Sequence, residues 1–245
     1  YTSIGIYSLP NLSVTGDTSI CLGESTQLSV SSGAISYGWT PSTSLNTPVG
    51  HIVLANPQDT TSYTITWIDQ NGCEGDTTHT VSVLPVPNVW VTATKDSICI
   101  GEPSNLMANG AFSYSYWTPL TSLNTITGTG PMVTATPTTT TTYSVIGTDT
   151  NNCSSTSLPI TINVNPLPIL SFTPPFPEIC KGDSVVITAS GAQDFWWDPP
   201  LGLNTSLGNS VVASPDTTTD YIIRGEDIND CSNVIQASVT VNTPP

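Results

Sequence analysis

The sequence predicts an all-β protein built as a tandem array of three β-sandwich domains. Three observations support this prediction. First, one set of residues recurs three times along the chain. Second, short stretches alternate polar and apolar residues. Third, glycine, proline and asparagine separate these stretches at intervals of about ten residues, as expected for turns. No segment of useful length has the 3.6-residue periodicity of an amphipathic helix. Short strands separated by such turns are typical of a β-sandwich.

Each repeat opens with a C-x-G-[ED] motif. The three motifs start at Cys21, Cys99 and Cys180, and so recur at intervals of about 80 residues. An interval of this length suits one small domain per repeat. We predict domains at 11–84, 85–167 and 168–245, with residues 1–10 as the end of a preceding repeat or a linker. The proline-rich segments at the predicted boundaries are expected to be extended, fairly stiff spacers.

Alternation marks the strands, and recurring aromatic residues mark the core. In repeat one, residues 27–30, 62–68 and 78–83 have a period of two. One tryptophan and one tyrosine recur at matching places where an immunoglobulin-like sandwich holds a buried tryptophan and a corner tyrosine. We therefore expect three immunoglobulin-like domains whose cores contain Trp39, Trp117, Trp197, Tyr63, Tyr143 and Tyr221.

Composition excludes several classes of function. Three basic residues face eighteen acidic ones, for a net charge of −15. Nucleic-acid binding and attachment to anionic membranes both need clustered basic side chains, so neither is expected, and nor is membrane insertion. The two histidines, His51 and His79, both lie in repeat one, and no phosphate loop, serine elbow or zinc-protease motif is present. We expect no enzyme activity and no cofactor, with calcium as the one exception.

Six cysteines at fixed places in the repeats indicate an oxidising compartment. Pairing within repeats would join Cys21–Cys73, Cys99–Cys153 and Cys180–Cys231. In an immunoglobulin-like topology, however, these partners lie at opposite ends of a strand, beyond the reach of a disulfide. A staggered set, Cys21–Cys153 and Cys99–Cys231, would instead join each domain to the next and leave Cys73 and Cys180 for neighbours outside the chain. The sequence leaves both interpretations open.

An Asp-x-Asn motif recurs before the second cysteine of each repeat. One interpretation is a hairpin turn whose side chains bond their own backbone. The other is a calcium site, because alternating carboxylate and amide oxygens can ligate a hard cation. The candidate ligands are Asp69, Asn71, Asp149, Asn151, Asp227 and Asn229.

Unmatched aromatic residues suggest an alternative binding function. Trp196 alternates with Trp197, so one of the two should face solvent, and Trp90 and Phe172 lie near the linkers. Exposed rings of this kind can stack on sugars, which makes a surface polysaccharide the alternative partner. The same rings can equally pack the junctions between domains.

The repeated pattern C-x-G-[ED], Trp-x-Pro, Pro-x-x-Thr-Thr-x-Tyr, Asp-x-Asn-x-Cys and Val-x-Val-x-Pro-x-Pro resembles a known family. It is similar to the Ig-like and PKD-like repeats of giant Bacteroidota surface adhesins that are exported by type IX secretion and associated with gliding motility. Residues 57–63, 137–143 and 215–221 show the similarity best. The W-x-F-G-D-G-type signature of PKD repeats is absent, which favours the Ig-like branch.

The resemblance implies an extracellular, cell-anchored role as a stiff rod or filament. Partners would be neighbouring repeats or like subunits arranged head to tail. A strand donated between subunits, from Tyr1 to Ser8, would suit such an assembly. The resemblance also implies O-glycosylation at Asp-Ser/Thr motifs, which occur here at Thr60, Thr77, Ser97, Ser184 and Thr217.

Overall fold

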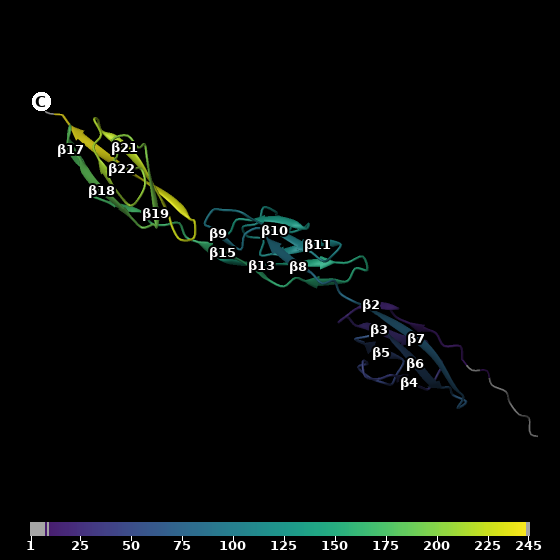
Figure 1. Ribbon diagram of the computed structural model, residues 1–245. Coiled ribbons are helices and arrows are strands. Elements are labelled where there is room, and N and C mark those ends of the chain that lie inside the picture. Colours follow the sequence, from purple (N-terminus) through teal and green to yellow (C-terminus); the bar gives the residue numbers. More distant parts are fainter. Residues whose placement is uncertain (1–7, 9, 244–245) are drawn as a thin grey trace, which may run out of the picture. The chain divides into compact units, whose positions relative to one another are not determined.

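The computed structural model describes residue 8 and residues 10–243, and every regular element in that part of the chain is a β-strand (Figure 1). The strands form three pairs of sheets, one pair in each predicted repeat. The predicted boundaries at 84/85 and 167/168 fall between strands. Among the described residues no helix has the length and hydropathy needed to cross a membrane. The suggested donor strand, Tyr1 to Ser8, lies outside the described residues except for Ser8.

Repeat one forms a three-stranded and a four-stranded sheet, in the orders β1-β3-β5 and β2-β7-β6-β4. Strand β2 pairs in parallel with the end of β7, and the other pairs are antiparallel. The strands are β1 (Val14–Thr15), β2 (Ser19–Cys21), β3 (Thr26–Val30), β4 (Ser36–Thr40), β5 (Ile52–Ala55), β6 (Thr61–Ile68) and β7 (Glu74–Leu84).

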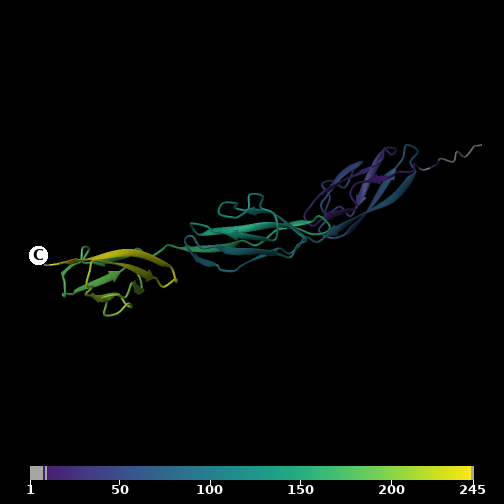
Figure 2. The ribbon, with the colours of Figure 1, turned by 90° about the horizontal axis from the view of Figure 1, so that it is seen from above.

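Repeat three has the same arrangement, with sheets in the orders β16-β18-β20 and β17-β22-β21-β19. Strand β17 again pairs in parallel with the end of the longest strand, β22. Figure 2 shows the two sheets of this repeat as separate layers. The strands are β16 (Ser171–Thr173), β17 (Glu178–Cys180), β18 (Val185–Ser190), β19 (Asp194–Asp198), β20 (Ser210–Ala213), β21 (Thr219–Glu226) and β22 (Ser232–Asn242).

The middle repeat keeps this plan, with sheets in the orders β12-β10-β8 and β11-β13-β15-β9, and with β14 also paired to β13. The short β14 and β15 together take the place of the single long strand of the other repeats. The strands are β8 (Trp90–Ala93), β9 (Ser97–Cys99), β10 (Ser104–Asn109), β11 (Ser113–Thr118), β12 (Met132–Ala135), β13 (Thr141–Thr148), β14 (Ser154–Thr156) and β15 (Ile160–Asn165).

The chain forms two compact units, and the middle repeat is divided between them. The first unit contains the described residues up to Trp90, with Ala108–Tyr116 and Val145–Leu158. The second contains Val91–Met107, Trp117–Ser144 and the described residues from Pro159 onward. The end of the middle repeat that contains Cys153 thus belongs to the same unit as repeat one.

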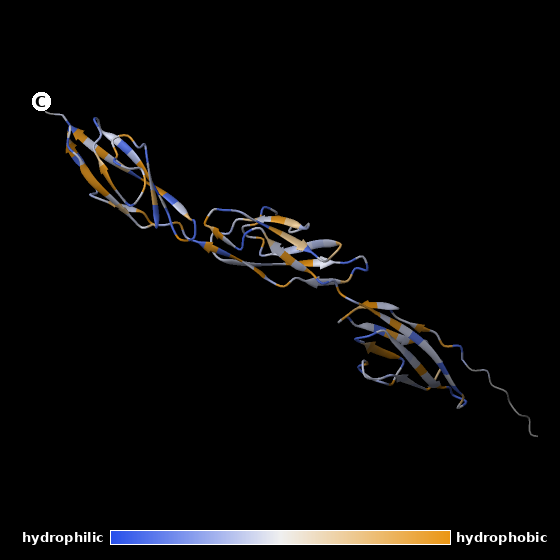
Figure 3. Cartoon of the chain, viewed as in Figure 1, coloured by the Kyte–Doolittle hydropathy of each residue, from blue (hydrophilic) through white to orange (hydrophobic). Residues whose placement is uncertain are grey.

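The core of each sandwich comes from alternation along the strands, which Figure 3 shows as hydrophobic residues separated by hydrophilic ones. On β6, Tyr63 and Ile65 are fully buried, Thr64 between them is half-buried, and the flanking Ser62 and Thr66 are exposed. In repeat three, Ile187, Tyr221 and Ile223 occupy the equivalent core. Full burial of one such side chain stabilises a fold by about 1.5–3 kcal/mol, which is why the apolar face decides the register.

The recurring tryptophans and tyrosines lie inside the sandwiches, at 0–2% exposure: Trp39, Trp117, Trp197, Tyr63, Tyr143 and Tyr221. Each indole nitrogen donates a hydrogen bond to a glycine carbonyl, at 2.8 or 2.9 Å. The tyrosine hydroxyls bond the loop that follows the tryptophan. Tyr221 donates to the Leu201 carbonyl at 2.6 Å, whereas Tyr63 and Tyr143 bond serine hydroxyls. The polar ends of these large side chains are thereby satisfied within the core.

Candidate functional site at the cysteine turns

Two disulfides join neighbouring repeats. Cys21 bonds Cys153 and Cys99 bonds Cys231, each over a sequence separation of 132 residues and a Cα–Cα distance of 5.5 Å. Cys21 and Cys153 belong to the first compact unit, and Cys99 and Cys231 to the second. Of the six cysteines, all within the described part of the chain, Cys73 and Cys180 remain free. The structure therefore contains the staggered pairing.

The pairing within repeats is wrong, and the length of one strand explains why. In repeat one, Cys21 lies beside Leu84 at the end of β7, whereas Cys73 directly precedes the first residue of β7. An eleven-residue strand spans about 35 Å, and disulfide-bonded Cα atoms must lie within about 7 Å. Repeat three repeats this arrangement, with Cys180 beside Asn242 and Cys231 directly before β22.

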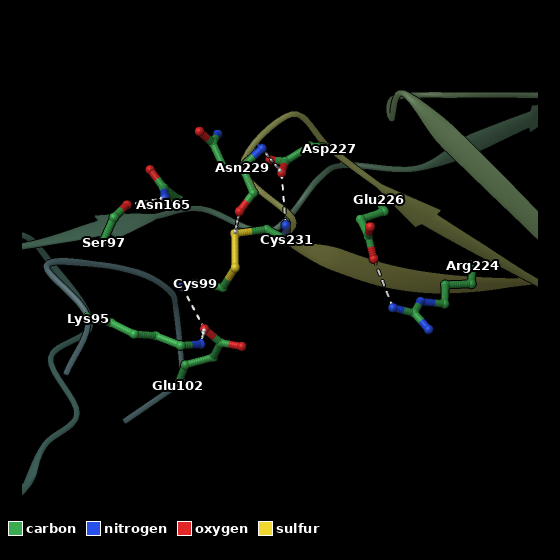
Figure 4. The surroundings of a disulfide bond; sticks show 10 residues. All are labelled: Lys95, Ser97, Cys99, Glu102, Asn165, Arg224, Glu226, Asp227, Asn229 and Cys231. Carbon is green, nitrogen blue, oxygen red and sulfur yellow. Dashed lines mark hydrogen bonds and ion pairs between the residues drawn. A yellow bond between two sulfur atoms is a disulfide. The ribbon is translucent and has the colours of Figure 1, made fainter. Parts of the chain in front are cut away.

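The first cysteine of each repeat lies in a C-x-G-[ED] turn. In repeat one, the Cys21 amide donates to the Glu24 carboxylate at 3.0 Å, and the Glu24 amide donates back to the Cys21 carbonyl at 3.0 Å. Cys99 and Glu102 form the same two bonds, at 3.3 and 2.9 Å (Figure 4). The glycine between them has a positive φ, a conformation that side chains disfavour.

In the middle repeat, the Glu102 carboxylate of this turn is held in its charged form. The Cys99 backbone amide, followed by the Lys95 ammonium 3.4 Å away, lowers the pKa of Glu102 below its usual value. The hydrogen bond to the cysteine is therefore charge-assisted, which makes it stronger than one between neutral groups.

The second cysteine of each repeat lies in an Asp-x-Asn-x-Cys turn. The Asp69 carboxylate accepts hydrogen bonds from the amides of Asn71 and Cys73, both at 2.8 Å. The two equivalent bonds measure 2.8 and 2.9 Å at Asp149, and 2.9 and 3.0 Å at Asp227. Figure 4 shows the Asp227 carboxylate directed at the amide of Cys231. Both kinds of turn therefore use a carboxylate to hold the backbone of a cysteine.

The calcium candidates lie in these same turns. One carboxylate oxygen of each aspartate is occupied by two backbone amides, and the three asparagines, Asn71, Asn151 and Asn229, are exposed. Residues 10–243 hold no group of three or more His, Cys, Asp or Glu side chains placed to bind a metal ion. The hairpin-turn interpretation accounts for the aspartates, and calcium binding stays a prediction.

The aromatic candidates are spread over the molecule. Trp196 is 37% exposed and lies on the outer face of β19, where the Arg224 guanidinium stacks over its ring at 5.4 Å. Trp90 is 45% exposed at the start of β8, and Phe172 packs against the core of repeat three. Trp90 belongs to the first compact unit, and Phe172 and Trp196 lie on different sheets of repeat three.

The glycosylation candidates differ in accessibility. Four of the five hydroxyl side chains are exposed: Thr60, Ser97, Ser184 and Thr217. Thr77 is half-buried in β7, opposite the core residue Ile65. Thr77 is therefore the least accessible of the five candidate sites.

Sequence reasoning missed the role of one recurring asparagine. The side-chain oxygen of Asn46 accepts a hydrogen bond from the Leu54 amide at 2.8 Å, and Asn124 and Asn204 repeat this bond. The Leu-Asn pair recurs in all three repeats, so the signal was present.

Trp67, which replaces the Gly147 and Gly225 of the other repeats, is also buried. Its indole nitrogen has no partner among the described residues.

No family model matches this sequence, and none of the curated proteins compared matches it. The comparison with solved structures found multi-domain proteins that are similar to this chain over most of its length. The N-terminal eight Ig domains of Down syndrome cell adhesion molecule match 91% of this chain and 35% of that chain, at 12% identity and a TM-score of 0.43. This chain therefore spans about a third of that structure.

Two further structures match nearly the whole chain. An I-band fragment of titin matches 94% of this chain and 98% of its own, at 14% identity and a TM-score of 0.39. A Ca²⁺-stabilised, ice-binding adhesin of an Antarctic bacterium matches 94% of this chain and 74% of its own, at 13% identity and a TM-score of 0.39. The assignment of three immunoglobulin-like sandwiches rests on the strand order and buried cores described above.

Proposed function

We propose that this chain is a non-catalytic structural segment of an extracellular, cell-surface adhesin or filament, and that it acts as a stiff spacer. The observation that carries the proposal is the staggered pair of disulfides. Each one adds a second covalent connection beside the peptide linker between two repeats. Two connections restrict bending and twisting at a junction far more than one does, so the bonds serve mechanical continuity.

The linkers support the same function. Pro85 and Pro87 precede the middle repeat, and Pro166 and Pro168 precede repeat three. The Ser155 hydroxyl donates to the Pro87 carbonyl, and the side-chain amide of Asn233 donates to the Pro168 carbonyl at 3.1 Å. Proline restricts the backbone of a linker, and these bonds attach each linker to the domain that follows it.

The disulfides support an extracellular location. Disulfides form and persist in oxidising compartments, and the chain contains two of them. Export by type IX secretion, a role in gliding motility and O-glycosylation follow from the family resemblance and are part of the proposal. Among the five candidate sites, we propose the exposed Thr60, Ser97, Ser184 and Thr217 as the glycosylated ones. Intact-mass analysis of native material would reveal such glycans.

Small-angle X-ray scattering tests the spacer function. We expect the oxidised chain to give a narrow distribution of intramolecular distances, and the Cys21→Ser/Cys153→Ser variant to give a broader one with shorter distances. The Cys73→Ser/Cys180→Ser variant is the matched control, because it removes two cysteines and keeps both disulfides. Identical distributions for all three proteins would refute a stiffening role.

A carbohydrate-binding module is the second candidate, and Trp196 supports it. A partly exposed indole on a sheet face, with Arg224 stacked on it, offers a flat surface for a sugar ring. Tryptophan fluorescence titrated with polysaccharides would show a saturable change that Trp196→Ala removes. A spacer without this function shows no saturable change in either protein.

A further inference from the structure

We propose that Cys180 forms a disulfide with Cys73 of a second copy of this chain, so that copies join head to tail into a covalent filament. This inference rests on the proposed structural function and names its partner and its bond. It begins from a regularity in the two disulfides within the chain.

Each internal disulfide joins one turn of each kind. Cys21 and Cys99 come from C-x-G-[ED] turns, and their partners Cys153 and Cys231 come from Asp-x-Asn-x-Cys turns. The two remaining cysteines are again one of each kind. Cys180 lies in a C-x-G-D turn, whose Asp183 amide donates to the Cys180 carbonyl at 2.9 Å. Cys73 lies in an Asp-x-Asn-x-Cys turn with the same bonds as its bonded equivalents.

The turns that contain the two free cysteines are not covered by a second turn. The bonded cysteines Cys153 and Cys231 are 0% exposed, whereas the equivalent Cys73 is partly exposed. Among the first cysteines of the repeats, the bonded Cys99 is 8% exposed and the bonded Cys21 is half-buried, whereas the free Cys180 is exposed. An open hollow of about 680 Å³ surrounds Cys180, lined by Glu178, Gly182 and Asp183 among others. In the other two repeats the equivalent cysteine is bonded to an incoming Asp-x-Asn-x-Cys turn.

Charge favours a second copy of this chain as the occupant, although the hollow also contains the acidic Glu178 and Asp183. The residue after each bonded cysteine is uncharged: Leu22, Ser154, Ile100 and Ser232. The residue after each free cysteine is charged, and the two signs are opposite, because Lys181 follows Cys180 and Glu74 follows Cys73. Lys181 is one of only three basic residues in the chain, and both side chains are exposed. Joining Cys180 to Cys73 would place this lysine near this glutamate.

The coupling is an oxidation that requires an acceptor of electrons. Two thiols lose two protons and two electrons and form one S–S bond. A small-molecule disulfide such as oxidised glutathione accepts the two electrons and the two protons, and is reduced to two thiols. The exchange proceeds through a mixed disulfide on one cysteine, which the thiolate of the other then attacks.

A mixing experiment with the folded chain tests the head-to-tail arrangement. Cys73→Ser keeps only the Cys180 thiol and Cys180→Ser keeps only the Cys73 thiol, and both variants retain the internal disulfides. In a glutathione redox buffer we expect the mixture to form heterodimers well above the half that random pairing gives. Wild-type chain should form a ladder of multimers, and the Cys73→Ser/Cys180→Ser double variant should stay monomeric.

Three results would overturn the proposal. The first is homodimer formation by either variant as fast as heterodimer formation. The second is a wild-type monomer that loses two hydrogens by closing Cys73 to Cys180 within one chain. The third is no dimer at all, although maleimide labelling shows both thiols to be accessible. None of these results affects the scattering test of the spacer function.

A charge exchange tests the choice of partner. With single-cysteine partners at low salt, we expect Lys181→Glu to slow heterodimer formation by about two- to fivefold, the range of an exposed ion pair turned into a repulsive one. Combining it with Glu74→Lys on the other partner should restore the rate. High salt should remove the difference. If the exchanged pair stays slow, the charge argument for a second copy is refuted.

Discussion

The staggered disulfides predict how far the unfolded chain can be stretched. When the chain is pulled from its two ends with both disulfides intact, force follows the shortest covalent path. That path runs to Cys21, across to Cys153, back to Cys99, across to Cys231 and on to the C-terminus. It contains about 88 residues, and at 3.3–3.6 Å per residue it extends to about 300 Å. The fully reduced chain of 245 residues extends to about 850 Å.

Removal of one disulfide makes the test specific for the pairing. In the Cys21→Ser/Cys153→Ser variant only Cys99–Cys231 remains, so about 112 residues carry force and the limit is about 390 Å. If the cysteines paired within repeats, this variant would instead lose two disulfides. About 193 residues would then carry force, and the limit would be about 670 Å. The oxidised wild-type chain does not separate the two arrangements, because both give nearly the same path.

Single-molecule force spectroscopy with optical tweezers measures these lengths directly. We expect a limit of about 300 Å for the oxidised wild type, about 390 Å for the variant, and about 850 Å for either protein in excess reductant. A limit of about 670 Å for the variant would refute the staggered connection, and with it the argument that the disulfides stiffen the junctions.

Three further predictions concern the turns and the core. Asp149→Ala leaves two amides without an acceptor and should lower the free energy of unfolding in urea by about 1–3 kcal/mol, whereas Asp149→Asn keeps one acceptor oxygen and should cost less. Trp117→Phe removes the bond to the Gly130 carbonyl and core volume, so it should cost about 2 kcal/mol, against under about 0.5 kcal/mol for Trp196→Phe. NMR titration should place the pKa of Glu102 below 4.5. The stabilisation from this carboxylate is then present above pH 4.5 and disappears as the pH falls through the lower, folded-state pKa, and Glu102→Gln should abolish that pH dependence.

The strands and the core were predictable because their signals are local. Alternation at 62–68 lies within β6, and the recurring tryptophans and tyrosines are buried in all three repeats. Burial of one face depends only on a period of two, which is readable from a short window of sequence. The prediction for β7 was too short, covering 78–83 rather than Glu74–Leu84. The first half of this strand has few apolar residues, so its pairing with β6 follows from hydrogen bonds that alternation does not reveal.

The turn motifs were found in the sequence, but their chemistry needed coordinates. Asp69 and Glu24 were visible as recurring acids, and the spacing of the Asp-x-Asn motif was compatible with backbone bonding and with calcium ligation. The structure shows both carboxylates on cysteine amides. Whether a carboxylate meets an amide or a cation depends on the direction of its oxygens, which a residue's place in the sequence does not specify.

Residue order alone was enough to establish three similar domains, the all-β class and the residues of each core, because repetition and alternation operate within one domain. The identity of each cysteine's partner required the folded chain. A disulfide forms only when two Cα atoms come within about 7 Å, and an eleven-residue strand separates Cys21 from Cys73 while the fold brings Cys21 to Cys153. The same three-dimensional arrangement leaves one cysteine of each kind unpaired.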